Sequence, residues 1–140
     1  MRVKRFHLDE EGINKFFGSL EAKIMEILWN NSKMTIKQVH ELINAESPIS
    51  LNAVMTVMTR LTDKDYLIKE SSGRGRTRLT FFSAPTTKEE FIQAQTQAVT
   101  DGLIADFGSY MVRNLIESLD KADPELIQQL ENKLKELKNE

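Results

Sequence analysis

The stretch that decides the fold is Ser50-Leu51-Asn52-Ala53-Val54-Met55-Thr56-Val57-Met58-Thr59-Arg60-Leu61. At about 100° per residue, a helix built from it gathers its apolar side chains on one side: Leu51, Val54, Met55, Val57, Met58 and Leu61. The opposite arc is polar, lacks bulky side chains and consists of Asn52, Ala53, Thr56, Thr59 and Arg60. Such a face fits a groove about 12 Å wide and places hydrogen-bonding groups against base edges. The stretch therefore predicts a helix that reads DNA.

The polar arc supplies the residues that we expect to contact bases. Asparagine pairs with adenine through two hydrogen bonds, and arginine pairs with guanine or holds a phosphate. We expect contacts from Asn52, Thr56 and Arg60, with three further residues beside them: Ser50, Ala53 and Thr59. The alternative is an ordinary solvated helix face.

A basic hairpin is expected shortly after this helix. Residues 66–70 and 76–83 have the character of two strands, and Ser71 to Gly75 that of a flexible turn. Three arginines lie in and beside the turn: Arg74, Arg76 and Arg78. They fit a wing that lays positive charge along the DNA backbone or in a minor groove. A charged tip that is merely solvated is the alternative.

Two helices are expected before the DNA-reading helix. The first is capped by Ser19 and extends to about Asn30. The second begins at the capping box Thr35-Ile36-Lys37-Gln38 and extends to about Asn44. The amides at its start favour a phosphate near Thr35 and Lys37, although capping alone also explains Thr35. The order helix, helix, helix, hairpin is that of a winged helix-turn-helix.

Three amphipathic helices are expected over the rest of the chain. A capping box at Thr87 opens them, Phe107-Gly108-Ser109 interrupts them, and Asp123-Pro124 starts the last. About 50 residues seldom stabilise themselves, so we expect the apolar stripes to pair with a second copy; folding back on the first domain is the alternative. The expected dimer contacts are Phe91, Val99, Leu103, Phe107, Tyr110, Met111, Leu115, Ile127, Leu130 and Leu134.

The predicted fold class is therefore mainly α with a small β-hairpin. Residues 1–86 form a winged-helix DNA-binding domain, and residues 87–140 form a helical dimerisation region. Residues 1–86 carry 13 basic and 10 acidic side chains, whereas residues 87–140 carry 6 and 11. This division favours separate roles for the two parts, although a difference of this size is common by chance.

Composition excludes several other classes. The chain has 140 residues and no cysteine, which removes disulfides, thiolate metal sites and cysteine nucleophiles. No apolar run approaches the roughly 20 residues that span a bilayer, and the basic N-terminus lacks the apolar block of a signal peptide. We therefore expect a cytoplasmic protein that does not insert into membranes.

Catalysis, cofactors and metal binding are not expected. The sequence has no nucleophile–base arrangement, no phosphate-cradling glycine loop and no supported carboxylate pair. His7 and His40 lie far apart in the chain and are expected at the surface. The tryptophan and three methionines are expected in the core: Trp29, Met25, Met55 and Met58.

Two segments, together with the arginine-bearing wing and Phe107-Gly108-Ser109, resemble the penicillinase repressors, a family that also includes the methicillin-resistance repressor and copper-responsive relatives. The two segments are Gly18-Ser19-Leu20-Glu21-Ala22-Lys23-Ile24-Met25-Glu26-Ile27-Leu28-Trp29 and residues 52–61, and the likeness extends from about Gly18 to Glu136. The resemblance implies a dimeric winged-helix repressor on a dyad-symmetric, palindromic operator in double-stranded DNA. It also implies a membrane-bound sensor protease that triggers cleavage in the dimerisation region and so releases the operator.

The chain departs from the family pattern in three places. Ala53 stands where members often have threonine, which puts one base or phosphate contact in doubt. The cysteine clusters of the copper-responsive branch are missing. The antibiotic-resistance branch is cut between asparagine and phenylalanine, for which Asn114-Leu115 is the nearest equivalent, so switching by proteolysis stays open. The alternative function is that of a winged-helix protein-interaction module that does not bind DNA.

Overall fold

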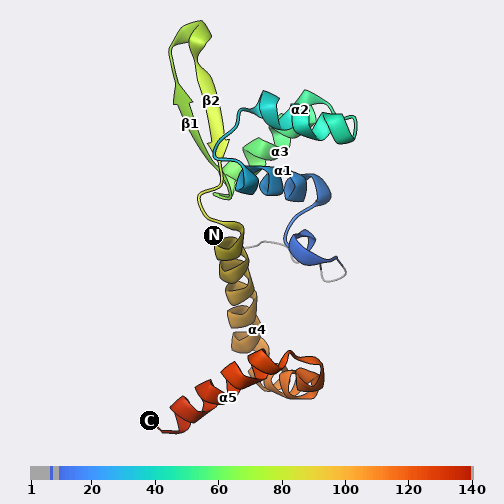
Figure 1. Cartoon of the computed structure of the whole chain (residues 1–140), viewed down its shortest axis with the longest axis vertical. Coiled ribbons are helices and arrows are strands. Elements are labelled where there is room, and N and C mark those ends of the chain that lie inside the picture. The colour runs from blue at the N-terminus through green and yellow to red at the C-terminus, as the bar shows by residue number, and fades with distance from the viewer. Residues whose placement is uncertain (1–6, 8–9, 140) are drawn as a thin grey trace. The chain divides into compact units, whose positions relative to one another are not determined.

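The computed structural model describes His7 and residues 10–139, and over these it contains five α-helices and a two-stranded antiparallel hairpin (Figure 1). The elements in chain order are η1 (Gly12–Lys15), α1 (Ser19–Asn30), α2 (Ile36–Glu46), α3 (Leu51–Asp63), β1 (Ile68–Ser72), η2 (Gly75–Thr77), β2 (Leu79–Ser83), α4 (Lys88–Ser118), η3 (Leu119–Lys121) and α5 (Pro124–Lys138). The predicted fold class, mainly α with a winged helix-turn-helix, is confirmed.

Side-chain capping explains where α2 and α3 begin. Thr35 caps α2 with the predicted box: its Oγ1 accepts from the Gln38 amide at 3.2 Å, and the Gln38 side chain accepts from the Thr35 amide at 2.9 Å. Ser50 caps α3. The predicted cap of α1 is wrong, because Gly18 occupies the N-cap position and Ser19 is the first helical residue.

In the hairpin, β1 begins two residues later than the sequence pattern predicts, and β2 is three residues shorter. β1 and β2 pair from Ile68 opposite Ser83 to Ser72 opposite Leu79. Residues 66 and 67 are buried in the core instead of joining the strand, and η2 takes up residues 75–77. A backbone bridge between Met34 and Phe82 fastens the hairpin's base to the segment between α1 and α2.

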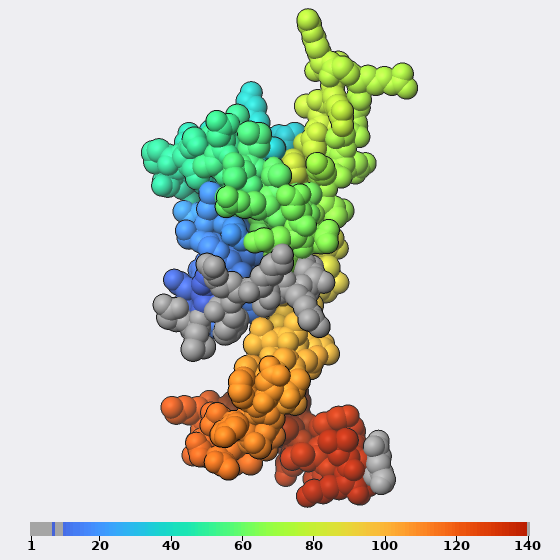
Figure 2. Space-filling model, turned by 180° about the vertical axis from the view of Figure 1, so that it is seen from behind, coloured from blue at the N-terminus to red at the C-terminus, as the bar shows by residue number. Residues whose placement is uncertain are grey.

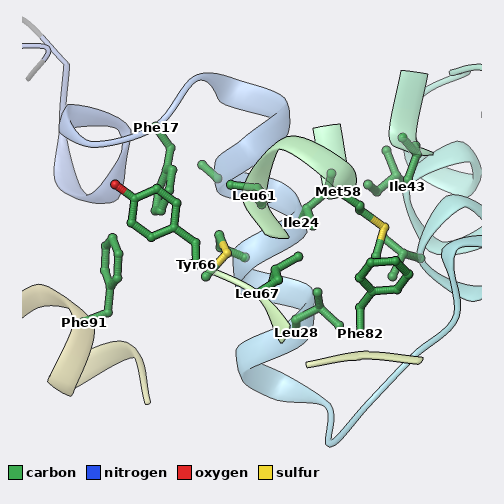
Figure 3. Close-up of a cluster of buried hydrophobic side chains, with 14 residues drawn as sticks. Phe17, Ile24, Leu28, Ile43, Met58, Leu61, Tyr66, Leu67, Phe82 and Phe91 are labelled. Carbon is green, nitrogen blue, oxygen red and sulfur yellow. The ribbon is translucent and has the colours of Figure 1, made fainter. Parts of the chain in front are cut away.

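A single apolar core holds the first three helices and the hairpin together. Figure 3 shows Met58 and Leu61 of α3 among side chains from α1 and from the hairpin. Trp29 is half-buried and packs against this core, as predicted, and Met25 lies within it. Burial of these side chains, at roughly 1.5–3 kcal/mol each, fixes α3 in place.

The beginning of α4 completes that core. Phe91 is 1% exposed, and its ring contacts those of Phe17, Trp29 and Tyr66 at centroid distances of 5.1, 5.3 and 5.7 Å. Figure 3 shows Phe91 close to Phe17 and Tyr66. The first compact unit of the chain accordingly extends beyond residue 86 to Val99. Phe91 was predicted as a dimer contact, and the structure corrects this: its ring is occupied within its own chain.

The second compact unit covers residues 100–140. α4 continues through it to Ser118, with non-helical backbone angles at Phe107 (φ −135°, ψ 32°), so the predicted interruption is a kink. Asp123 caps α5 by accepting from the Glu125 amide at 2.9 Å, and Pro124 is the first helical residue, as predicted. None of residues 100–139 is buried. Within one copy, this unit therefore has no closed core.

Candidate nucleic-acid interface

The side of α3 that faces away from the core is open to solvent. Four of the predicted contact residues on it are exposed: Asn52, Thr56, Thr59 and Arg60. Ala53 is half-buried, and the exposed Ser50 accepts the Ala53 amide at 3.1 Å. Figure 2 shows the surface of α3, in green, uncovered, with the yellow-green hairpin projecting near it. The structure thus brings the predicted residues onto one accessible face.

The core-facing side of α3 is narrower than the sequence pattern predicts. Val54, Met58 and Leu61 are buried, whereas Leu51 and Met55 are 45% and 42% exposed. The predicted core position of Met55 is therefore wrong. Met55 lies three residues before Met58, which turns it by roughly 60° around the helix and out of the contact with the core.

The turn between α2 and α3 is fixed by two side chains of α2. His40 Nε2 donates to the carbonyl oxygen of Ile49 at 2.8 Å, and Asn44 Oδ1 accepts from the Ile49 amide at 3.0 Å. Ile49 itself packs against the core. Sequence reasoning placed His40 at the surface and missed this role, although His40 and Asn44 are four residues apart and share a face of the helix.

The start of α2 provides one exposed cation. Lys37 is exposed and forms no ion pair with another described residue. Thr35 is half-buried, and its hydroxyl already accepts the Gln38 amide. Capping therefore accounts for Thr35, and Lys37 is the residue here whose side chain is open to a phosphate.

The tip of the hairpin presents its arginines outward. Arg74, Arg76 and Arg78 are all exposed, and none is ion-paired with another described residue. The Thr77 hydroxyl donates to the Arg74 carbonyl at 2.8 Å and receives the Arg74 amide at 3.3 Å. Gly73 has φ +86°, and a Cβ there would lie 2.4 Å from the Thr77 carbonyl oxygen. The tip is thus a defined turn that requires glycine at this position.

One further cation near the hairpin was not identified from the sequence. Lys33 Nζ lies 5.0 Å from the centroid of the Phe81 ring, over its face. Lys33 is in the connection between α1 and α2, so no local pattern predicts its contact with a strand almost 50 residues away. It adds positive charge close to the wing.

Metal ligands and membrane spans were searched among the described residues. No group of three or more His, Cys, Asp or Glu side chains there is arranged to hold a metal ion. None of the helices in that part of the chain has both the length and the apolar character of a membrane span. His7, like His40, is half-buried.

Comparison with known proteins places this arrangement in a family. The family model described as penicillinase repressor matches residues 17–136, from just before α1 to near the end of α5. The chain belongs to the penicillinase repressor family. The resemblance noted in the sequence is confirmed, and the match includes both compact units of this penicillinase repressor family member.

Individual relatives match shorter stretches of this family member. The transcriptional regulator BlaI from Mycobacterium tuberculosis is 36% identical over 53 residues, in strain CDC 1551 / Oshkosh and in strain ATCC 25618 / H37Rv alike. That match covers 37% of this chain and 38% of the length of the relatives.

Three solved structures show partial similarity to this chain. The DNA-binding domain of the repressor BlaI has a TM-score of 0.45 at 19% identity and covers 56% of this chain and 90% of its own. A transcriptional regulator from Clostridium thermocellum has a TM-score of 0.42 at 18% identity, and the match covers 64% of this chain and 90% of that one. ZitR from Lactococcus lactis, solved in complex with DNA, has a TM-score of 0.42 at 17% identity, and the match covers 98% of this chain and 86% of that one.

Proposed function

We propose that this penicillinase repressor family member is a homodimeric transcriptional repressor that binds a dyad-symmetric operator in double-stranded DNA. The observation that carries the proposal is the exposed polar face of α3, from Asn52 to Arg60, in the same compact unit as an exposed arginine hairpin. A helix of this kind enters the major groove, and a basic wing follows the backbone. The proposal assigns the protein no catalytic activity and no cofactor, and it places the protein in the cytoplasm.

Affinity and sequence choice come from different residues in this proposal. Arg74, Arg76 and Arg78, together with Lys37, neutralise phosphates and supply the salt-dependent part of binding. Asn52, Thr56 and Arg60 meet base edges and supply the choice of sequence. Support comes from their exposure and from the lack of ion pairs to other described residues that would hold the cations elsewhere.

The dimer contact is proposed for the second compact unit and the end of the first. Exposed apolar side chains of this size in a single copy are typical of an interface. Six of the proposed contact residues are exposed: Leu103, Phe107, Tyr110, Leu115, Ile127 and Leu134. Val99, Met111 and Leu130 are half-buried. Pairing would bury them and would fix the spacing between the two copies of α3.

Release of the operator by proteolysis is part of the same proposal. Asn114 and Leu115 are exposed on α4, and cutting between them would separate α5 from the rest of the dimer contact. The protease that the resemblance implies is a membrane-bound sensor. The bond lies in a helix, so the helix must open locally before a protease accepts it.

The salt dependence of binding tests this proposal against the protein-interaction module. The affinity of the full chain for a random-sequence duplex is measured by fluorescence anisotropy at several salt concentrations. We expect log affinity to fall linearly with log salt, with a slope of about −0.9 per phosphate contact. Arg74→Ala and Arg76→Ala should each reduce the steepness of this slope by about one per lost phosphate contact, whereas Lys138→Ala at the end of α5 should leave the slope unchanged. A slope near zero contradicts the proposal.

A further inference from the structure

Beside its polar face, the exposed surface of α3 carries a row of apolar side chains. Leu51 and Met55 are nearly half exposed although the same helix buries Val54, Met58 and Leu61. A single exposed leucine needs no explanation. Here two large apolar side chains are exposed in one row, on the helix that also carries Asn52 and Arg60. Because this helix is the one proposed to contact DNA, their exposure calls for an explanation.

Thr59 extends this row by one turn. Its hydroxyl donates to the carbonyl oxygen of Met55 at 2.8 Å, which directs the hydroxyl back along its own helix. The hydroxyl hydrogen is then engaged within the helix, and the exposed Thr59 side chain offers its methyl group and the oxygen lone pairs to an outside contact. Leu51, Met55 and Thr59 are four residues apart and form one row, which we name the apolar edge of α3.

Each residue of the apolar edge immediately precedes a residue of the polar face. Leu51 is followed by Asn52, Met55 by Thr56, and Thr59 by Arg60. Met55 also follows Asn52 by three residues, and Thr59 follows Thr56 by three, so the two rows are neighbours on the helix surface. With a rise of 1.5 Å per residue, the apolar edge is about 12 Å long, which corresponds to roughly three to four base-pair steps of DNA.

We propose that the apolar edge of α3, with Met55 at its centre, contacts the C5-methyl groups of thymines in the operator. The inference rests on the proposed function, because it requires α3 in the major groove. The thymine methyl is the one apolar group that base pairs present there. The flexible, unbranched Met55 side chain adapts to a methyl group at slightly different positions. The operator half-site therefore contains thymines beside the bases that Asn52, Thr56 and Arg60 read.

The experiment alters the base as well as the protein. A duplex is first selected from random sequence with the full chain, and each thymine is then replaced singly by deoxyuridine, which removes only the C5-methyl group. For the unaltered protein we expect one or more positions in each half-site where this replacement raises Kd roughly threefold to fivefold, the effect of one buried methyl group. This part of the experiment uses only the unaltered protein, so a change in Kd cannot come from a misfolded variant.

The second arm assigns the effect to Met55. Met55→Ala should bind the thymine and the deoxyuridine duplex equally at such a position, and Met55→Leu should retain most of the difference. Leu42→Ala is the matched control, since Leu42 is 47% exposed on α2 and borders a pocket with α1 residues instead of the exposed face of α3. It should leave the difference unchanged.

The outcomes separate this inference from the proposed function. Failure to select any duplex contradicts the proposed function itself. A selected duplex whose Kd is unchanged by deoxyuridine at every position overturns the inference alone. So does a methyl effect that Met55→Ala and Leu51→Ala both leave intact, because the methyl groups would then be read by another part of the protein.

Discussion

The ring of Phe91, in α4, is stacked on the ring of Phe17, just before α1, with centroids 5.1 Å apart and an interplanar angle of 17°. This contact joins the end of the winged helix to its beginning. A second link is the ion pair between Lys88 Nζ and Glu26 Oε1 at 2.6 Å. The first turns of α4 are therefore a structural part of the proposed DNA-binding unit.

Replacing Phe91 by alanine should destabilise the first compact unit strongly. Phe91 is almost fully buried among four aromatic rings, so Phe91→Ala should lower the free energy of unfolding by about 3–5 kcal/mol. Urea unfolding is followed by the fluorescence of Trp29, the chain's single tryptophan, whose ring lies 5.3 Å from that of Phe91. The exposed Leu42→Ala should change stability little. Equal unfolding midpoints for Phe91→Ala and the unaltered chain would contradict the assigned packing.

The role of Thr35 can be decided by comparing two substitutions. Its hydroxyl caps α2, so Thr35→Ala should lower the free energy of unfolding by about 1 kcal/mol, while Thr35→Ser should retain most of the stability. Both variants are measured by urea unfolding. Full stability of Thr35→Ala would contradict the capping role of the hydroxyl.

Two glycines at the hairpin tip make a matched pair. A methyl group at Gly73 would lie 2.4 Å from a backbone oxygen, whereas one at Gly75 would meet nothing within 4 Å. Gly73→Ala should therefore distort the tip and weaken DNA binding severalfold, with little change in the unfolding of the helical core. Gly75→Asn, which tolerates φ +55°, should bind nearly as well as the unaltered chain. Equal binding by the two variants would exclude the tip's shape as a factor.

Stability should fall at high pH because of Tyr66. Burial, and then the nearby charge of Glu21, raise the pKa of the Tyr66 phenol above its ordinary value. The folded state thus favours the neutral phenol, and this contribution is present below about pH 10 and is lost as the pH rises through the folded pKa. Urea midpoints measured between about pH 8 and 11 should fall more steeply for the unaltered chain than for Tyr66→Phe. Parallel profiles would contradict this assignment.

Local sequence signals predicted most of the fold. The capping pattern at Thr35, the Asp123-Pro124 pair and the periodicity of α3 are each set by neighbours a few residues apart, so they can be read without the tertiary structure. The shift of β1 from the expected residues 66–70 to Ile68–Ser72 could not be read this way. Tyr66 has strong strand character, but its ring packs on Phe17 and Phe91 from distant segments.

The polar residues of the candidate site could be predicted from the sequence, whereas the contacts that hold the site in place could not. Exposure of Asn52, Thr56 and Arg60 follows from helical periodicity alone. Periodicity does not show how much of the apolar side of α3 is covered by the core, and Met55 was therefore wrongly expected to be buried. The contacts of His40 with Ile49, and of Lys33 with Phe81, depend on how separate segments meet, and no pattern along the chain encodes them.

Selection of bound duplexes from random-sequence DNA with the full chain tests the central claim most directly. We predict an enriched sequence with two inverted half-sites whose centres are about 10 base pairs or a multiple apart, since a dimer places its two α3 helices on one face of the duplex. Arg60→Ala should raise Kd for that duplex by a factor of about 5 to about 150, corresponding to about 1–3 kcal/mol. A selection that enriches no sequence, or a selected duplex that Arg60→Ala and Asn52→Ala bind as tightly as the unaltered chain, would contradict the claim.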